Sequence, residues 1–298
     1  MNEYKKIIKS QRIRFIILRI LRIIPNKTMV KIQYRIKMGI KLNLKNPKRY
    51  TEKIQWYKLY YHNPIMTKCV DKYEVRQYLE SKGLEYILPK LYNVYERVED
   101  IDEEELPEKF VLKTTNGSGT NIFCKNKEQF SLLKYKKKIK SWLNTDFYGL
   151  GREWAYKGVK PRIVIEELLE EKESEFSGIN DYKFLCFNGK VEYIVLDLDR
   201  YVEHKRNIYD KDWNYIDVET DCKKYGDRVE KPQELKKMIE IAEKLSKEFP
   251  AVRIDLYCVN NKIYFGEMTF YPWTGYVKFY PDKFDIELGK KFKGEKND

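Results

Sequence analysis

The stretch AVRIDLYCVNNKIYFGEMTF, residues 251–270, consists of two runs of alternating side chains separated by two asparagines. Such a pattern predicts a β-hairpin whose first strand carries Asp255 and whose second strand carries Glu267. A strict two-residue turn would place these acids on opposite faces of the hairpin, whereas a three-residue loop with Asn261 in the left-handed region would place them on one face. We expect the three-residue loop, which brings the two carboxylates together.

Two neighbouring carboxylates with a hydroxyl beside them suit a magnesium ion. Thr269 shares a strand face with Glu267, because successive side chains alternate between faces. Mg²⁺ prefers oxygen ligands and keeps waters or phosphate oxygens in place of a closed protein cage. The hairpin therefore predicts a metal site formed by Asp255, Glu267 and Thr269, and the alternative is a pair of solvated acids on a surface hairpin.

The composition indicates a folded protein with an aromatic core. The chain has 298 residues, 42% of them hydrophobic, with 25 Tyr, 14 Phe and 5 Trp, enough apolar area for a sizeable core. Five cysteines without a C-x-x-C pair fit a reducing compartment, so we expect a cytoplasmic location. The two histidines, His62 and His204, leave little room for a zinc cluster or for histidine-centred nucleophilic catalysis. We expect any chemistry to rest on Lys, Arg, Asp and Glu.

The positive charge of the chain is concentrated at its start. Residues 1–49 contain 15 Lys or Arg and one acid, whereas the remaining residues carry 44 basic and 45 acidic side chains. Isoleucines recur in this segment at helical spacing, with arginines on another face, which predicts a basic amphipathic helix. Two partners stay open: an anionic membrane surface, or the body of the protein itself. The residues concerned are Ile13, Ile16, Ile17, Ile20, Ile24, Arg12, Arg19 and Arg22.

Other partners of this basic segment are not expected. The longest apolar run in it, residues 15–18, is too short to span a bilayer, and no signal-peptide pattern opens the chain. No recognisable nucleic-acid recognition module accompanies the charge, so no nucleic-acid partner is expected. The expected location is cytoplasmic, with peripheral contact at the inner face of the membrane if the helix binds lipid.

A second motif, FVLKTTNGSGTNIF at residues 110–123, is a strand, a turn rich in glycine and hydroxyl groups, and another strand. Glycines let backbone N–H groups approach phosphate oxygens, hydroxyls add donors, and a lysine adds a compact positive charge. It is not a Walker P-loop, because no Gly-Lys-Ser/Thr follows and no helix opens there. The motif predicts a flap over phosphates, and the alternative is an ordinary surface hairpin. Its candidate residues are Lys113, Gly117, Ser118, Gly119, Thr120 and Asn121.

Several motifs in a fixed order resemble the ATP-grasp superfamily. They are the Asp-Lys pair at 71–72, the glycine-rich motif, the strand and hinge at 163–169, Asp-Tyr-Lys at 181–183, and the hairpin. More narrowly, the chain resembles the TupA-like ATP-grasp family of bacterial surface-polysaccharide and teichuronopeptide loci over residues 45–285. The stretches that carry this narrower resemblance are EKIQW (52–56), DKYEVR (71–76), GREWAYK (151–157), DYKF (181–184) and HKRNIYD (204–210).

The resemblance implies an α+β protein with the ATP-grasp fold. Two α+β subdomains would grip ATP between antiparallel sheets, with the glycine-rich turn as a lid and a basic helical segment at the N-terminus. We expect that segment over residues 1–48 and a helical region over 49–100. The N-subdomain would follow over 101–165, and the C-subdomain with the metal site over 166–298.

The resemblance also implies roles for individual residues. Phosphates of ATP would contact two lysines, adenine would meet the hinge backbone, and the ribose would meet an acid. Magnesium would bind the hairpin acids, and an arginine on the same hairpin would steady the transferred phosphoryl group. By position these are Lys72 and Lys113 for phosphate, Glu166, Glu167, Leu168 and Leu169 for adenine, Asp181 for ribose, Asp255 and Glu267 for Mg²⁺, and Arg253, Lys113 and Lys183 for catalysis.

The activity implied is that of a carboxylate–amine ligase. A substrate carboxylate would attack the γ-phosphate of ATP, and an amine would then displace phosphate from the acyl phosphate. Such chemistry depends mainly on positioning and charge neutralisation, which needs no histidine. The carboxylate would belong to a uronic acid of a glycan, an amino acid or a peptide, in modification of a cell-surface or capsular polysaccharide or its precursor. The acceptor candidates are Asp199, Arg200, Arg206 and Asn207.

One departure from the family pattern and two alternative functions stay open. Many superfamily members have asparagine two residues after the metal-binding glutamate, where this chain has Thr269, so a second metal would be held less strongly or completed by water. Asp197-x-Asp199 also matches the D-x-D pattern of metal-dependent glycosyltransferases, since alternation places both acids on one face of a strand. A third hypothesis is a nucleotide-binding protein without catalysis that tethers a polysaccharide assembly.

Overall fold

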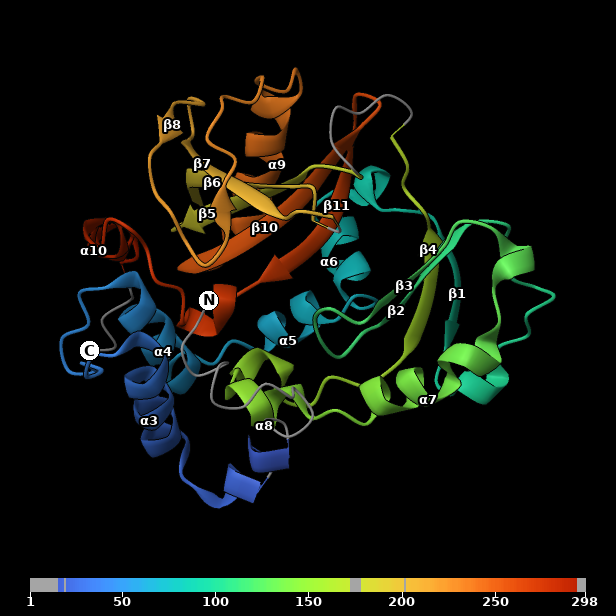
Figure 1. The fold of residues 1–298 in the computed structure, drawn as a ribbon, viewed down its shortest axis with the longest axis horizontal. Helices are drawn as coiled ribbons and strands as arrows, with labels where there is room; N and C mark the ends of the chain where they lie inside the picture. Colours follow the sequence, from blue (N-terminus) through green and yellow to red (C-terminus); the bar gives the residue numbers. More distant parts are fainter. Residues whose placement is uncertain (1–15, 19, 172–177, 201, 294–298) are drawn as a thin grey trace.

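Two sheets organise the protein, and both are antiparallel except for one short parallel pairing (Figure 1). The computed structural model describes residues 16–18, 20–171, 178–200 and 202–293. The smaller sheet has the strand order β1-β4-β2-β3 and the larger has β11-β10-β5-β6-β7-β8, with β9 beside β7. This arrangement confirms the predicted α+β class. The strands are β1 (Leu91–Tyr95), β2 (Phe110–Thr114), β3 (Asn121–Cys124), β4 (Ile163–Glu167), β5 (Asp181–Phe187), β6 (Lys190–Leu198), β7 (Lys205–Asp210), β8 (Tyr215–Ile216), β9 (Lys223–Lys224), β10 (Ala251–Val259) and β11 (Lys262–Thr269).

The smaller sheet is built around the glycine-rich motif. Its strands β2 and β3 form the hairpin that carries the turn, and β4 pairs with β2 on the other side. Helix α7 (Leu132–Leu143) buries Leu132 and Ile139 in a cluster with Phe110 and Ile165. The predicted strands of this region are confirmed, and burial of one apolar helix face holds the sheet in shape.

The larger sheet carries the second half of the site. Strand β5 lies at its centre, between β10 and β6, and all seven of its residues are buried. Helix α9 (Leu235–Ser246) packs its apolar stripe, with Met238 and Leu245, against β5, β6 and β10. The strand β4 leads from the smaller sheet through residues 168–180 into β5, so the predicted hinge joins the two sheets.

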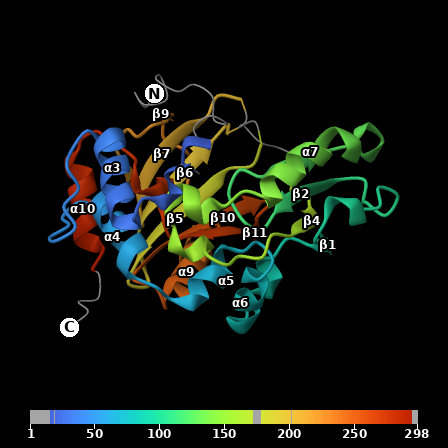
Figure 2. The ribbon, with the colours of Figure 1, turned by 90° about the horizontal axis from the view of Figure 1, so that it is seen from below.

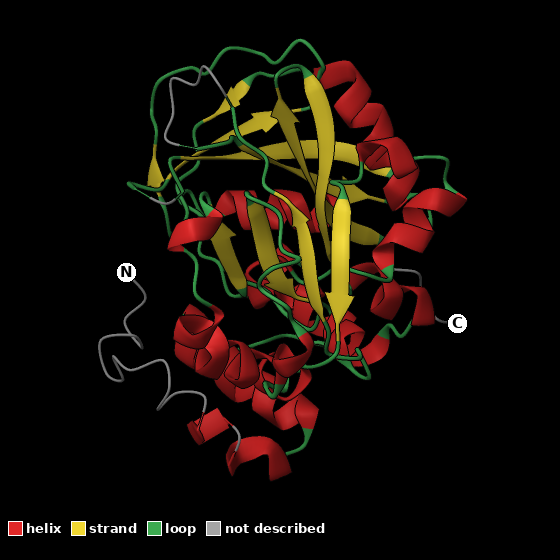
Figure 3. Cartoon of the chain, turned by 90° about the vertical axis from the view of Figure 1, so that its right-hand side faces the viewer, coloured by secondary structure: helices red, strands yellow, loops and turns green. Residues whose placement is uncertain are grey.

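Helices gather at the end of the molecule opposite α7 (Figure 2). There α4 packs against α10 and α3, and Figure 3 shows the helices placed around the strands of the two sheets. Asp71 accepts hydrogen bonds from the backbone of Tyr73 (2.7 Å) and Glu74 (3.0 Å), so it caps the turn that leads into α6. Besides α7 and α9, the structure has the helices α3 (Asn26–Met38), α4 (Tyr50–Tyr60), α5 (Pro64–Val70), α6 (Val75–Ser81), α8 (Phe147–Gly151) and α10 (Lys283–Lys291).

The turn of the β10–β11 hairpin differs from the prediction. Val259 lies opposite Lys262, so the connection is a two-residue turn, and Asn260 and Asn261 have φ of 49° and 59°. The expected three-residue loop is therefore wrong. A positive φ at both positions is the signature of the turn that matches the twist of a hairpin.

A β-bulge places the two acids opposite each other instead. Leu256 lies opposite Phe265 but Asp255 lies opposite Glu267, which leaves Gly266 as one extra residue on β11. A Cβ on Gly266 would lie 2.9 Å from the carbonyl oxygen of Asp255. Glycine is required here because the backbone of β10 approaches so closely.

The N-terminal helix prediction can be compared with the structure only in part, because Arg12, Ile13 and Arg19 lie outside the described residues. Ile16 and Ile20 are strongly exposed, whereas Ile17 and Ile24 are half-buried. The first two isoleucines therefore do not pack on the body of the protein. Within the described ranges, no helix combines the length and apolarity needed to cross a bilayer.

Replacement of the bulge glycine tests this account of the hairpin. We expect Gly266→Ala to lower the free energy of unfolding by about 1–3 kcal/mol, because the new methyl group must displace backbone. Asn261→Gly is the matched control, since glycine is favoured at a positive φ in this turn. Urea unfolding followed by circular dichroism measures both. A Gly266→Ala protein as stable as the wild type would contradict the close approach.

Candidate functional site

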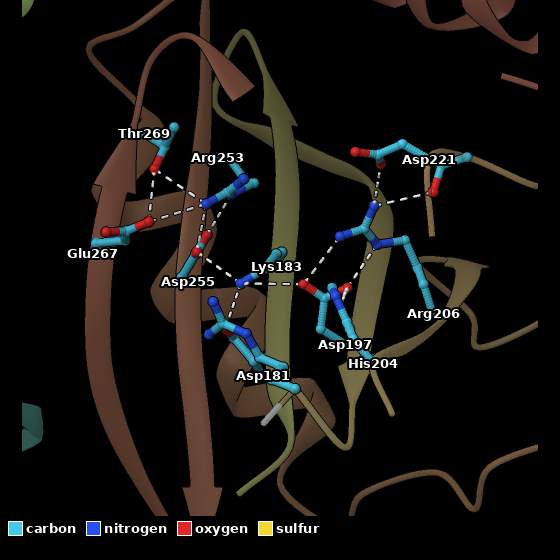
Figure 4. Close-up of polar contacts among 12 residues, drawn as sticks. Asp181, Lys183, Asp197, His204, Arg206, Asp221, Arg253, Asp255, Glu267 and Thr269 are labelled. Atoms are coloured by element: carbon cyan, nitrogen blue, oxygen red, sulfur yellow. Dashed lines mark hydrogen bonds and ion pairs between the residues drawn. The ribbon is translucent and has the colours of Figure 1, made fainter. Parts of the chain in front are cut away.

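Asp255 and Glu267 meet on adjacent strands and share one arginine (Figure 4). Arg253 Nε lies 2.7 Å from Asp255 Oδ1, and its Nη2 lies 2.7 Å from Asp255 Oδ2 and 3.1 Å from Glu267 Oε1. Burial disfavours the charged arginine, yet the two carboxylates raise the pKa of Arg253 above its usual value. The arginine therefore stays charged between the acids, and the predicted convergence of the acids is seen.

Thr269 lies beside Glu267, as its strand position predicted. Its hydroxyl donates to Glu267 Oε1 at 3.2 Å and accepts from Arg253 Nη2 at 3.3 Å. Burial would raise the pKa of Glu267, but Arg253 and nearby lysines hold it below the usual value. Glu267 is thus held in its ionised form. Among the described residues no group of three His, Cys, Asp or Glu side chains is arranged for a metal ion, so a cation at this hairpin needs further oxygens from a ligand or water.

Lys183 connects the hairpin acids to the next strand of the sheet (Figure 4). It projects from β5, the neighbour of β10, and its Nζ lies 3.1 Å from Asp255 Oδ2 and 3.8 Å from Asp197 Oδ2. It also pairs with Asp181, which pairs in turn with Arg200. These side chains form an alternating row of acids and bases across three strands.

One carboxylate oxygen of Asp181 lacks a partner among the described residues. Both of its cations contact Oδ2, whereas Oδ1 is buried without a hydrogen-bond partner in the described part of the chain. A buried carboxylate oxygen left without a donor is costly unless something outside the chain supplies one. This geometry is compatible with the predicted contact to ribose.

The two lysines predicted to bind phosphate belong to the glycine-rich motif and its surroundings. Lys113 on β2 donates to Glu166 Oε2 at 2.8 Å, and Arg76 contacts the other oxygen of Glu166 at 3.2 Å. Lys72 donates to the backbone carbonyls of Thr114, at 3.1 Å, and Gly117. Burial lowers the pKa of Lys72, while the charge of Glu267 opposes that shift. Lys72 therefore links the loop electrostatically to the hairpin acids.

The glycine-rich turn is anchored at its base and exposed at its tip. Asn116 donates to the carbonyls of Trp142 at 3.1 Å and Thr145 at 3.3 Å, at the end of α7. Thr120 and Asn116 are buried, whereas Ser118 and Gly119 are exposed, and Asn121 begins β3. A free surface hairpin would not bury polar side chains in this way. The predicted flap is therefore a turn with a fixed base and a solvent-exposed tip.

The hinge residues Glu167, Leu168 and Leu169 are half-buried where β4 leaves the smaller sheet. The backbone N–H of Glu167 donates to the carbonyl of Lys90 at 2.9 Å, which fixes the first of them. Glu166, immediately before them, is held by Lys113 and Arg76. Sequence reasoning missed Arg76 as a site residue, although it ends the DKYEVR motif.

The D-x-D interpretation is wrong in its geometry. Asp197 is buried on β6, but the strand ends at Leu198 and Asp199 follows it with a φ of 49°, so alternation no longer relates the two acids. Asp197 is also bonded to Arg206 at 2.6 Å and to His204 at 3.1 Å. Burial would raise the pKa of Asp197, but His204, Arg206 and Lys183 lower it.

His204 was not singled out by sequence reasoning as a site residue. The carboxylate of Asp197, 3.1 Å from Nε2, raises the pKa of the imidazole to about 9. Arg206 and Asn207, predicted to contact an acceptor, are buried in the fold. Arg206 bonds Asp197 and Thr220, and Asn207 Nδ2 donates to the carbonyl of Asp227 at 2.8 Å. Of the four acceptor candidates, Arg200 contacts the row of charges through Asp181 and Arg206 contacts it through Asp197.

Two adjoining cavities lie beside the base of the glycine-rich turn. One, of about 320 Å³, is lined by Asn116, Phe147 and Arg22 among others, and the other, of about 410 Å³, by Lys27, Lys58 and Trp154. Tyr148 and Lys157 line both. Cations and aromatic rings dominate the walls of the second cavity, whereas the first is mixed and contains Asp146, which pairs with Arg22 at 3.0 Å. Sequence reasoning missed both cavities because their lining comes from distant segments.

Two antiparallel sheets, with paired acids on a hairpin of the larger one, are the architecture that the ATP-grasp resemblance predicted. The chain belongs to the TupA-like ATP-grasp family, whose model matches residues 52–293, and this confirms the resemblance seen in the sequence. No curated protein matches the chain.

The solved structures that match the chain include two ligases and an ATP-grasp domain protein. D-alanine–D-alanine ligase from Bacillus anthracis shares 18% identity, with a TM-score of 0.43, over 68% of this chain and 57% of that one. Phosphoribosylamine–glycine ligase from Thermotoga maritima shares 17%, with a TM-score of 0.40, over 69% and 48%. An ATP-grasp RimK domain protein from Sphaerobacter thermophilus shares 9%, with a TM-score of 0.42, over 77% and 69%. This chain thus spans about half the length of the first two.

The packing of the glycine-rich turn against α8 can be tested by mutation, because Gly117 lies against Phe147. A Cβ on Gly117 would lie 2.3 Å from the ring of Phe147. We expect Gly117→Ala to destabilise the protein by about 1–3 kcal/mol through overpacking. In a Phe147→Ala background the same change should cost less, with a coupling energy of at least about 1 kcal/mol. Urea unfolding of the wild type, the two single variants and the double variant gives the double-mutant cycle. Strictly additive effects would contradict the contact between Gly117 and Phe147.

Proposed function

We propose that the protein is an ATP- and Mg²⁺-dependent ligase that joins a carboxylate to an amine through an acyl phosphate. The observation that carries this proposal is the pair of acids on β10 and β11, which lie opposite each other beside a buried arginine. Two lysines, Lys72 and Lys183, stand close to the same acids. Membership in the TupA-like ATP-grasp family supports the same activity.

The residues present fit magnesium and a nucleotide. Asp255, Glu267 and the hydroxyl of Thr269 offer the oxygen ligands that Mg²⁺ prefers, with waters and phosphate oxygens completing the shell. The ion, when bound, would neutralise charge on the transferred phosphoryl group. Phosphate oxygens would accept hydrogen bonds from Lys72 and Lys113. In this structure Lys72 donates to loop carbonyls and Lys113 donates to Glu166. The unpartnered oxygen of Asp181 would accept from a ribose hydroxyl.

The proposed reaction has two displacements. A carboxylate oxygen of the substrate forms a bond to the γ-phosphorus while the bond from that phosphorus to the β-bridging oxygen breaks, which releases ADP. The amine nitrogen then bonds to the acyl carbon, phosphate leaves with the electron pair of its bond, and the amine loses a proton. Arg253, held charged in the site, would stabilise the oxyanion that forms at each step.

The acceptor is proposed to be a cell-surface or capsular polysaccharide or its precursor, modified with an amino acid or another amine. The cavities beside the glycine-rich turn support an anionic, sugar-containing substrate. Their cations would attract carboxylates, and Tyr148 and Trp154 offer flat apolar faces. Of the residues predicted to contact the acceptor, Asp199 and Arg200 remain the candidates.

Trapping the acyl phosphate tests the reaction. Incubation with ATP, Mg²⁺, hydroxylamine and a panel of uronic acids, amino acids and short peptides should give ADP and a hydroxamate only when a competent carboxylate is present. We expect Glu267→Gln to lower the rate by at least about 10²-fold, because it removes a charged ligand. Glu192→Gln is the matched control, since Glu192 pairs with Lys291 outside the site.

Two outcomes would contradict the ligase proposal. ATP binding without turnover of any carboxylate in a broad panel would favour the nucleotide-binding assembly protein. Turnover of a sugar nucleotide that survives Asp255→Asn but is lost in Asp197→Asn would favour glycosyl transfer.

A further inference from the structure

The outer face of α3 and the residues before it expose a series of isoleucines. Large apolar side chains with this much exposure are spread singly elsewhere in the described chain, but six of thirteen fall within residues 16–40. We call these six the isoleucine surface. They are Ile16 (50% exposed), Ile20 (67%), Ile23 (90%), Ile32 (41%), Ile36 (60%) and Ile40 (39%).

The isoleucine surface is not the core-facing side of α3. That side holds Met29, Val30 and Tyr34, which are buried against the rest of the protein. Tyr34 hydrogen-bonds Thr51 on α4 at 2.9 Å, and Gln33 accepts from Tyr276 at 2.8 Å. Helix α3 therefore has two apolar sides. One side packs against the protein and the other is exposed. Its second apolar side needs another partner, because contiguous exposed apolar residues are rare on monomeric proteins.

Basic side chains flank the isoleucine surface, the segment itself supplies no acid, and one acid from outside it, Asp146, pairs with Arg22 at 3.0 Å. Residues 4–51 contain 15 Lys or Arg and neither Asp nor Glu. On and after α3, the exposed Lys31, Arg35 and Lys41 each adjoin an isoleucine in the chain. An apolar row bordered by cations matches the boundary between anionic headgroups and acyl chains, where apolar groups insert and cations meet phosphates.

The surface is attached to the region of the glycine-rich turn. Arg152, the C-cap of α8, donates to the carbonyl of Leu21 at 3.0 Å and to Asn26 Oδ1 at 3.0 Å. Arg22 and Lys27, from the same segment, line the two cavities beside the turn. Figure 1 shows α3 and the segment before it along the lower left margin of the molecule, with α8 next to them.

We propose that the isoleucine surface binds the face of an anionic lipid bilayer, with its isoleucines at the headgroup boundary and the neighbouring lysines and arginines on lipid phosphates. Charge complementarity selects this occupant, because the segment repels a second copy of itself and lacks the acids that a basic partner would need. A bound chain would hold the two cavities close to the bilayer. This proposal does not depend on the ligase activity.

Vesicle co-sedimentation of the full chain tests the proposal. The vesicles are phosphatidylcholine alone, or phosphatidylcholine with one third phosphatidylglycerol, each at low and high salt. We expect at least about tenfold more binding to the anionic vesicles at low salt, and a loss of most of that binding at high salt. Equal binding to both compositions, or no binding to either, would overturn the proposal.

Matched variants separate the surface from general charge. Ile32→Ser with Ile36→Ser should lower binding to anionic vesicles at least about tenfold, and Lys31→Gln with Arg35→Gln should do likewise. Leu133→Ser with Lys134→Gln changes a similarly exposed apolar residue and a lysine on α7, and should bind as the wild type does. Thermal melts confirm that each variant is folded.

The remaining outcomes are equally decisive. If the α7 control loses as much binding as the α3 variants, the lipid contact is not specific to the isoleucine surface and the proposal is wrong. If the α3 double-serine variant keeps full lipid binding but converts a dimer to a monomer in sedimentation equilibrium, the isoleucine surface is an interface between copies of this chain.

Discussion

The contact of one arginine with two carboxylates on adjacent strands is the constraint on which the rest of the site depends. Arg253 can reach both Asp255 and Glu267 only because the two acids lie directly opposite each other. That register exists because β11 carries one extra residue, and Gly266 is the residue that can occupy it. The row of charges through Lys183 then extends from the hairpin across β5 to β6.

The charges of the site are arranged to receive more charge from a ligand. Each acid has a cation within contact distance, yet one oxygen of Asp181 has no donor among the described residues. Lys72 and Lys113 are tied to the loop and to Glu166, partners that phosphate oxygens could replace. Buried ionic networks of this kind contribute little to stability by themselves, because desolvation offsets much of the attraction. In the proposed reaction such a network would supply preorganised electrostatics for phosphoryl transfer.

Sequence reasoning predicted the two strands and the convergence of their acids correctly. It attributed that convergence to the wrong backbone feature, a three-residue loop in place of a two-residue turn with a β-bulge. A three-residue loop and a two-residue turn with a bulge give the same relation between Asp255 and Glu267, so the side-chain pattern cannot distinguish them. Gly266 inside a strand was the available signal, since an isolated strand glycine indicates a bulge. The D-x-D interpretation failed because a strand end is not visible in alternation. Cavities lined by distant segments, such as those beside Asn116, are not encoded in any local pattern.

The central claim is that this hairpin binds ATP through magnesium, and thermal stability of the full chain titrated with ATP tests it most directly. A ligand that binds the folded state raises the melting temperature with the logarithm of its concentration. We expect a rise with ATP only when Mg²⁺ is present, its loss in Glu267→Gln and its retention in Glu192→Gln. No rise with ATP and Mg²⁺, together with a rise with Mn²⁺ and a sugar nucleotide, would contradict the account.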